Sequence, residues 1–158
     1  MFDIVLYEPE IPPNTGNIMR LCANTGATLH LIGPLGFTLD ERQLRRAGLD
    51  YRDWADVRQH KSVAAYLEKR SPPALYAFSR NGTSDYSELF YEPGDALIFG
   101  PESDGLPADV LQLEAVTATV RVPMVGKSRS LNLANAVAVA LYEALRQQGF
   151  PGLQKGGS

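Results

Sequence analysis

The stretch Val122–Leu145, VPMVGKSRSLNLANAVAVALYEAL, joins the end of an apolar strand to an apolar helix through a short polar segment. That segment, GKSRSLN, contains two cations, two serines and an asparagine. From Leu133 to Leu141 only Asn135 is polar, so apolar side chains surround most of the helix. A helix of this kind must be covered on more than one side. We therefore expect a second copy of the chain to cover it, which predicts a homodimer.

The same alternation of strand and helix extends over the rest of the chain. Apolar, β-rich runs predict five strands: Phe2–Tyr7, Thr28–Ile32, Ala74–Phe78, Ala96–Phe99 and Ala118–Val122. Helical patterns predict five helices: Asn17–Thr25, Asp40–Ala47, Ser62–Arg70, a short one after Pro107, and Asn132–Gln148. This order predicts an α/β fold with a mainly parallel sheet flanked by helices. Such folds bind their ligands at the carboxyl ends of the strands.

The composition excludes several classes of protein. The 158 residues are 44% hydrophobic and 21% charged, which is typical of a globular chain, and we expect one domain, 1–152, with a short tail, 153–158. No apolar run is long enough to cross a membrane, and the first residues resemble a strand rather than a signal peptide. A single cysteine, Cys22, indicates a reducing, cytoplasmic setting, and with only two histidines a metal site is not expected. Because the net charge is −3, any nucleic-acid binding must come from a local patch.

The segment after the first strand, Pro9–Gly26 (PEIPPNTGNIMRLCANTG), has a polar stripe on its predicted helix. At about 100° per residue, Asn17, Arg20 and Asn24 share one face of that helix. A cation between two amides suits a phosphate, a ribose or a carboxylate. A solvated helix face is the alternative, and Asn14 could be the N-cap of the helix.

Two further strand ends are followed by segments that could bind a ligand. LIFGPESDGLP, Leu97–Pro107, runs from a buried strand into a turn with two glycines and the carboxylate of Glu102. It lacks the glycine pattern of a dinucleotide or phosphate loop, and a tight connection between strand and helix is the alternative. In GKSRSLN, an N-cap role explains only one of Ser130 and Asn132. The helix start with Lys127 and Arg129 favours contact with an anion or a nucleic acid.

Arginines are concentrated in RQLRRAGLDYR, near Tyr51 and Trp54. Arginine with aromatic residues suits an RNA backbone and unstacked bases. The alternative is a helix surface whose charge is balanced by neighbouring aspartates and glutamates.

These segments, in this order, resemble the three motifs of the SPOUT superfamily of S-adenosylmethionine-dependent RNA methyltransferases. The helix with Asn14 and Arg20 resembles the first motif, FGPESDGLP the second, and VPMVGKSRSLNLANA the third. LYEPEIPPNTGNIMRLCANTG and LRRAGLDY resemble most closely the small tRNA (cytidine/uridine-34-2'-O)-methyltransferases of that superfamily. The resemblance extends from Met1 to about Gly152.

The resemblance implies a dimeric enzyme with a trefoil knot near its C-terminus and S-adenosyl-L-methionine as cofactor. Its substrate would be the anticodon stem-loop of tRNA, methylated on the ribose 2'-oxygen of the wobble nucleotide, a cytidine or a modified uridine. By motif, the cofactor contacts would be Phe78, Gly100, Val122 and Ser130. Catalysis would involve Arg20, Glu102, Ser130 and Asn132, with Asn14 in support. As RNA contacts we expect Arg42, Arg45, Arg46, Lys127, Arg129 and Tyr142.

Two other functions stay open from the sequence. The first is 2'-O-methylation of ribosomal RNA or of another position in tRNA. The second is a dimer that binds RNA without catalysis.

Overall fold

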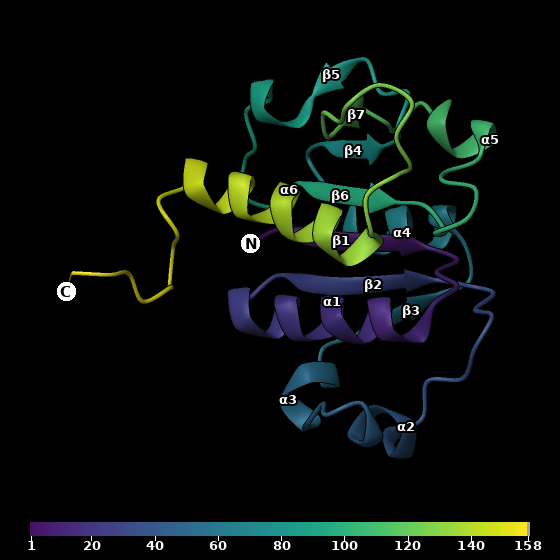
Figure 1. Ribbon diagram of the computed structural model, residues 1–158, viewed down its shortest axis with the longest axis vertical. Helices are drawn as coiled ribbons and strands as arrows, with labels where there is room; N and C mark the ends of the chain where they lie inside the picture. The colour runs from purple at the N-terminus through teal and green to yellow at the C-terminus, as the bar shows by residue number, and fades with distance from the viewer. Residues whose placement is uncertain (158) are drawn as a thin grey trace.

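In the computed structural model, which describes residues 1–157, seven parallel strands form one sheet between two layers of helices (Figure 1). The strands are β1 (Asp3–Tyr7), β2 (Thr28–Ile32), β3 (Arg58–His60), β4 (Leu75–Phe78), β5 (Ser84–Asp85), β6 (Ala96–Phe99) and β7 (Ala118–Arg121). Their order across the sheet is β3-β2-β1-β6-β4-β7-β5, and every strand pair is parallel. This confirms the predicted α/β class.

The helices cover both faces of the sheet. They are α1 (Pro12–Thr25), α2 (Glu41–Arg46), α3 (Tyr51–Trp54), α4 (Val63–Arg70), α5 (Ala108–Leu111) and α6 (Leu133–Gln147), with a 3-10 turn η1 (Tyr86–Glu88). Helices α1 and α6 contact each other on one face, and α4 lies on the opposite face (Figure 1). No helix among residues 1–157 is both long and apolar enough to cross a membrane.

Two apolar cores, one on each face, explain why the central strands β1, β6 and β4 are nearly continuous apolar runs, with the charged residue Asp3 at the start of β1. In β1, Ile4 and Leu6 pack toward α1 and α6, whereas Val5 packs toward α4. Strands buried on both faces are continuous hydrophobic runs rather than alternating ones. That is why the five predicted strands are confirmed to within one residue at each end.

The structure differs from the prediction at the start of the first helix and in the short elements. Helix α1 begins at Pro12 rather than Asn17, because proline is well tolerated in a first turn, where its missing N–H has no partner to lose. Asn14 therefore lies inside the helix and is not its N-cap, which is Ile11. Strand β3 is polar (RQH) and β5 has two residues, so neither has a hydrophobic pattern.

A buried polar cluster lies between β1, β2 and α4. The carboxylate of Asp3 accepts hydrogen bonds from Tyr66 Oη (2.8 Å) and from the guanidinium of Arg70 (2.7 and 3.0 Å). His30 Nε2 lies 3.3 Å from this carboxylate, and His30 Nδ1 is 2.9 Å from His60 Nε2. Burial alone would raise the pKa of Asp3, but contacts with His30, Arg70 and Tyr66 hold it well below its ordinary value. Burial and the neighbouring His30 lower the pKa of His60.

This cluster predicts that the protein loses stability in mild acid. The folded state keeps His60 neutral below the ordinary histidine pKa of 6.5, whereas the unfolded chain takes up a proton there. The free energy of unfolding should therefore fall as the pH drops through 6.5, and the contribution of Asp3 should be lost only below its ordinary pKa of 3.8. Thermal melting between about pH 8 and pH 5 measures the first effect. His60→Gln should flatten that part of the curve, and an unchanged slope in the variant would assign the effect to other groups.

Candidate functional site

The carboxyl ends of the strands bring the three predicted motifs to one edge of the sheet. Residues 8–11 follow β1, residues 100–107 follow β6 and residues 122–132 follow β7. Because all strands are parallel, these loops lie at the same edge, where ligands of α/β proteins bind.

The carboxylate of Glu102 ties two of these loops together. Its Oε1 accepts a hydrogen bond from the backbone N–H of Glu10 at 2.8 Å, and its Oε2 accepts one from the N–H of Ile11 at 2.8 Å. The amide of Asn14 also donates to Oε2, at 3.1 Å. A carboxylate at a helix N-terminus satisfies free N–H groups and interacts favourably with the helix dipole. Glu102 thus fixes the start of α1 against the loop after β6.

Asn14 extends this connection to the third motif. Its Oδ1 accepts a hydrogen bond from Asn132 Nδ2 at 3.1 Å, and Asn132 Oδ1 accepts the N–H of Asn135 at 3.2 Å as the N-cap of α6. We call Glu102, Asn14 and Asn132 the amide–carboxylate network. Glu10 reinforces it, because its carboxylate accepts from both the N–H and the hydroxyl of Ser103 at 2.9 and 2.8 Å.

The predicted cofactor contacts lie at the ends of three adjacent strands. Phe78 ends β4 and is paired with Phe99 of β6 and Val120 of β7. The rings of Phe78 and Phe99 stack with centroids 4.5 Å apart. Gly100 and Val122 directly follow the ends of β6 and β7.

Gly100 has no room for a side chain, because the loop after β6 folds back over it. A Cβ at this position would lie 2.2 Å from the backbone N of Leu106 and 2.3 Å from the carbonyl carbon of Gly105. Ser130, in the loop before α6, is exposed, and its hydroxyl has no hydrogen-bond partner among residues 1–157. The same loop exposes the apolar side chains of Val125 (81% exposed) and Leu131.

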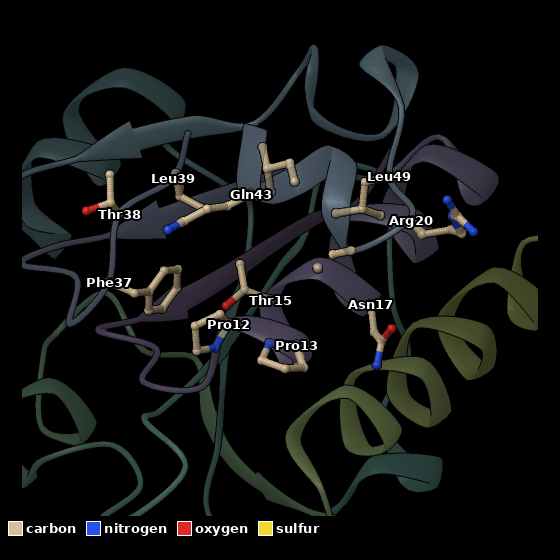
Figure 2. A pocket seen from close by; sticks show the side chains of 13 residues that line it. Pro12, Pro13, Thr15, Asn17, Arg20, Phe37, Thr38, Leu39, Gln43 and Leu49 are labelled. Carbon is tan, nitrogen blue, oxygen red and sulfur yellow. The ribbon is translucent and has the colours of Figure 1, made fainter. Parts of the chain in front are cut away.

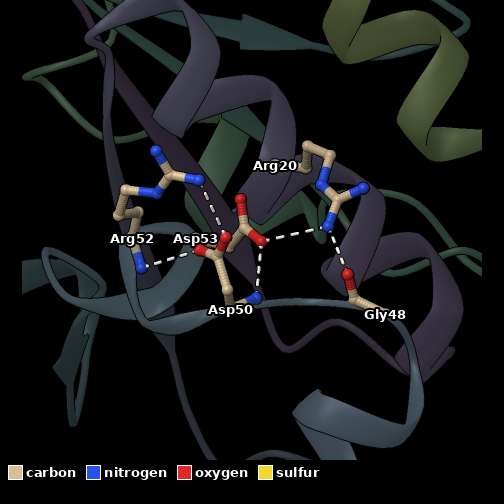
Figure 3. Close-up of polar contacts among 5 residues, drawn as sticks. All are labelled: Arg20, Gly48, Asp50, Arg52 and Asp53. Atoms are coloured by element: carbon tan, nitrogen blue, oxygen red, sulfur yellow. Dashed lines mark hydrogen bonds and ion pairs between the residues drawn. The ribbon is translucent and has the colours of Figure 1, made fainter.

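Within residues 1–157, Arg20 makes no hydrogen bond to the amide–carboxylate network. Its guanidinium donates to the carbonyl of Gly48 and to Asp53 Oδ2, the latter at 3.1 Å, as Figure 3 shows. Asp53 is buried and also accepts the N–H of Asp50 at 2.8 Å, whereas the Arg20 side chain is half exposed. The predicted stripe of Asn17, Arg20 and Asn24 is exposed. Helix α3 therefore orients the guanidinium of Arg20 but leaves it accessible to a ligand.

A pocket of about 390 Å³ lies on the Arg20 side of α1 (Figure 2). Its walls come from α1, from the loop after β2 and from α2 and the residues that follow it. Arg20 and Asn17 lie at one end of the labelled side chains in Figure 2, and Phe37 lies at the other.

The predicted RNA contacts fall into separate parts of the chain. Arg42, Arg45 and Arg46 are exposed on α2, where Arg45 forms an ion pair with Glu41. Lys127 and Arg129 are exposed in the loop after β7, on the other side of the central strands. Tyr142 is 44% exposed on α6. The structure therefore does not join them into one patch in a single chain.

Metal and thiol chemistry have no visible site in the described chain. Within residues 1–157, no three His, Cys, Asp or Glu side chains are grouped so as to hold a metal ion. Cys22 is buried in the core, and burial raises the pKa of its thiol to about 12.

Several residues of this region were not predicted. Asp53, which pairs with Arg20, belongs to a four-residue helix with too few residues to show a period. Glu10 and Ser103 lie in predicted motifs, but their contact joins residues 93 positions apart. Arg80, whose guanidinium donates to the carbonyl of Ser128 at 2.8 Å, follows β4. The position of Arg80 after the end of a strand was the one sequence feature that could have indicated it as a site residue.

Comparison with known proteins identifies relatives over almost the whole chain. Residues 1–142 match the model of the SpoU rRNA Methylase family. The chain is 55% identical over 152 residues to the tRNA (cytidine(34)-2'-O)-methyltransferase of Escherichia coli K12, covering 96% of this chain and 97% of the relative. It is 53% identical to the enzyme of the same name from Yersinia pestis, with the same coverage of both chains.

Solved structures agree with these relatives. A structure described as giving insight into the 2'-OH methylation of C/U34 on tRNA superimposes with a TM-score of 0.84 at 50% identity, covering 94% of this chain and 97% of the other. The SpoU methyltransferase AviRb from Streptomyces viridochromogenes, in complex with AdoMet, superimposes with a TM-score of 0.79 at 27% identity. That match covers 96% of this chain and 58% of AviRb.

Proposed function

This chain belongs to the SpoU rRNA methylase family, and from that premise we propose that it methylates the ribose 2'-oxygen of cytidine 34 in tRNA. The methyl donor is S-adenosylmethionine, as in relatives crystallised with AdoMet. A tRNA substrate and a single buried cysteine fit the cytoplasm, which we propose as the compartment.

The amide–carboxylate network is the observation that supports this function most directly. It connects the three motifs through the side chains of Asn14, Glu102 and Asn132. Ser130 lies two residues before Asn132 in the sequence, and its hydroxyl makes no hydrogen bond within residues 1–157. Both oxygens of Glu102 already accept backbone N–H groups, so this carboxylate positions α1 rather than taking a proton from the substrate. Asn132 is likewise committed to Asn14 and to the cap of α6.

The strand ends at β4, β6 and β7 fit a bound S-adenosylmethionine. We expect the cofactor to be held by the backbone at Phe78, Gly100 and Val122 and by Ser130. The exposed apolar side chains of loop 122–132 would cover the apolar surface of the cofactor. The absence of a side chain at Gly100 lets the backbone of residues 105–106 pass directly over the end of β6, which shapes the space beside it. When bound, this cofactor supplies a methyl group already activated on a sulfonium sulfur.

The chain's own task is to align the ribose and to stabilise the oxygen that attacks. We assign the orientation of the 2'-hydroxyl to Ser130, whose hydroxyl is free to accept or donate. Arg20 binds the ribose or its phosphate and stabilises the negative charge that develops on the oxygen. We assign it no role as a base, because its guanidinium presents N–H donors and no acceptor. Because the guanidinium of Arg20 is bound to Gly48 and Asp53 and makes no hydrogen bond to Asn14, Glu102 or Asn132, we propose that it acts on the active site of the partner subunit.

This arrangement requires a dimer, which we propose to form through α6. Val139 and Tyr142 expose apolar surface on this helix, although its other face is buried against the core. We also propose that residues 122–132 pass through the loop 100–107 as a trefoil knot. The segment leaves β7 on one side of β4 and enters α6, which packs on α1. A crystal structure that traces loop 100–107 around this segment checks the knot.

RNA binding is distributed over the dimer in this proposal. The cations of α2 from one subunit and Lys127 and Arg129 from the other would contact phosphates on one bound stem-loop. Contacts of this kind release counterions, so the affinity for tRNA should fall as salt rises.

Mass-spectrometric mapping of the methylated nucleotide tests the function. The purified protein is incubated with labelled S-adenosylmethionine and either total tRNA, ribosomal RNA or an isolated anticodon stem-loop. A label on the ribose of cytidine 34 is expected. Label only in ribosomal RNA or at another tRNA position, or binding without any label, would replace this function with one of its alternatives.

Glu102→Gln should weaken both the fold and the reaction. The neutral amide keeps one acceptor oxygen and turns an NH₂ group toward backbone N–H donors, so we expect a loss of about 1–3 kcal/mol in the free energy of unfolding. Turnover should fall more than affinity for the cofactor, because the start of α1 shifts. Urea unfolding and single-turnover methylation measure the two effects. Glu114→Gln, at an exposed glutamate outside the network, is the matched control and should behave as wild type.

A further inference from the structure

The pocket beside α1 is not accounted for by the proposed reaction. Part of its wall comes from α2, which lies on the other side of α1 from α6 in Figure 1, and none of the predicted cofactor contacts lines it. The reaction uses only Arg20 at its rim.

The walls of the pocket are mostly apolar, with polar groups at a few positions. The phenyl ring of Phe37 faces Pro12 and Thr15 across the pocket (Figure 2). The amides of Asn17 and Gln43 and the guanidinium of Arg20 are exposed around it. A volume of about 390 Å³ is ample for one planar heterocycle with its sugar.

Thr15 provides an independent sign of a ligand. It is 1% exposed and lines the pocket, and its hydroxyl has no hydrogen-bond partner among residues 1–157. Most threonines inside a helix return the hydroxyl to a backbone carbonyl, as Thr25 does with Leu21 at 2.8 Å. A buried hydroxyl without a partner is costly, so it marks a place where a polar ligand atom would be bound.

We propose that this pocket takes one unstacked nucleobase of the substrate RNA, stacked on Phe37, and that Arg20 binds the phosphate next to that nucleotide. Every nucleobase has a π-face that suits an aromatic side chain, and hydrogen-bonding edges that suit amides and hydroxyls. The position of Arg20 at the rim gives its guanidinium access to the backbone of the same nucleotide. Base capture on one subunit would then hold the RNA while its target ribose reaches the partner's cofactor. The inference rests on the proposed function, because it assumes an RNA substrate.

Photo-crosslinking tests the occupant directly. A tRNA anticodon stem-loop carries 5-iodouridine at each loop position in turn, and the crosslinked peptide is identified by mass spectrometry. A crosslink to Phe37 from one loop position is expected, and it should persist in Phe90→Leu, the same change at an exposed phenylalanine outside the pocket. Crosslinks that avoid residues 33–49 at every loop position overturn the inference.

Affinity measurements separate the pocket from the fold and from the reaction. Phe37→Leu should weaken stem-loop binding by about tenfold, while the affinity for S-adenosylmethionine stays unchanged. Thr15→Val should weaken RNA binding without lowering the melting temperature, because it removes a hydroxyl that has no partner in the free protein. Wild-type RNA affinity in both variants overturns the inference. If both variants methylate cytidine 34 normally, the base-binding proposal is overturned and the proposed function stands. If Phe37 crosslinks to the RNA but cytidine 34 stays unmethylated, the proposed function is overturned and the base-binding proposal stands.

Discussion

Arg20→Ala is expected to reduce methyl transfer by about 100- to 1,000-fold while leaving the affinity for S-adenosylmethionine unchanged. The loss follows from removing the group that stabilises negative charge on the attacking oxygen. Cofactor affinity should persist because the guanidinium contacts Gly48 and Asp53, far from the strand ends that would hold the cofactor. Single-turnover methylation and calorimetric titration of the cofactor measure the two quantities. Near-normal turnover would remove Arg20 from the mechanism.

A purely structural role for Arg20 predicts a different pattern. Its guanidinium is half exposed, and the buried carboxylate of Asp53 keeps the hydrogen bond from the N–H of Asp50 when Arg20 is removed. The melting temperature of Arg20→Ala should therefore change little, and Arg52→Ala, which removes the exposed partner of Asp50 in the same region, should keep wild-type turnover. A large fall in melting temperature that parallels the loss of turnover would favour the structural role.

Mixing two inactive variants tests whether Arg20 acts across the dimer. In a heterodimer of Arg20→Ala and Ser130→Ala, a site built from both subunits is either doubly substituted or intact. If Arg20 serves the partner's site, random exchange should restore roughly a quarter of wild-type activity, because half of the dimers are mixed and each has one intact site. If Arg20 serves its own subunit, no site is intact and the mixture stays inactive.

The sequence predicts the central fold well because the central strands are buried on both faces. Runs such as Ala96–Phe99 have no polar residue, so their pattern needs no information about neighbours. The edge strand β3 and helix α3 were missed for the opposite reason. Arg58–His60 is polar, and Tyr51–Trp54 is too short for a helical period, so tertiary packing alone determines their structure.

The sequence predicts which residues belong to the candidate site, but not the contacts between them. Asn14, Glu102 and Asn132 were selected by motif, yet their hydrogen bonds join residues 88 and 118 positions apart. Sequence periodicity cannot predict hydrogen bonds between residues so far apart in the chain, because these bonds depend on which strand ends lie together at one edge of the sheet. Asp53 shows the same limit. In the sequence it is one of several acids balancing arginines, whereas in the structure it is the buried group that orients Arg20.

Gly100→Ala is expected to have the largest effect on the cofactor side of the molecule. The added methyl group would lie 2.2 Å from the backbone N of Leu106 and 2.8 Å from Cα of Gly105, well inside van der Waals contact. These are backbone atoms, so a rotamer change cannot relieve the overlap. The loop cannot simply move outward, because Leu106 is buried in the core beside Val110. We expect a loss of about 3 kcal/mol or more in stability, and no measurable binding of S-adenosylmethionine.

Two other glycines, Gly126 and Gly105, serve as controls, because a Cβ added at either position would have open space around it. Gly126, in the loop after β7, has no left-handed backbone, and a Cβ added there would have no atom within 4 Å, so Gly126→Ala should be nearly neutral. Gly105 also has open space but a φ of +68°, so Gly105→Ala should cost about 1 kcal/mol through backbone strain alone. Urea unfolding and cofactor titration of the three variants should therefore rank Gly100 far above Gly105, and Gly105 above Gly126. If Gly100→Ala unfolds like Gly126→Ala and still binds the cofactor, the close passage of residues 105–106 over Gly100 does not shape the binding site. The glycine would then be explained by local flexibility rather than by packing.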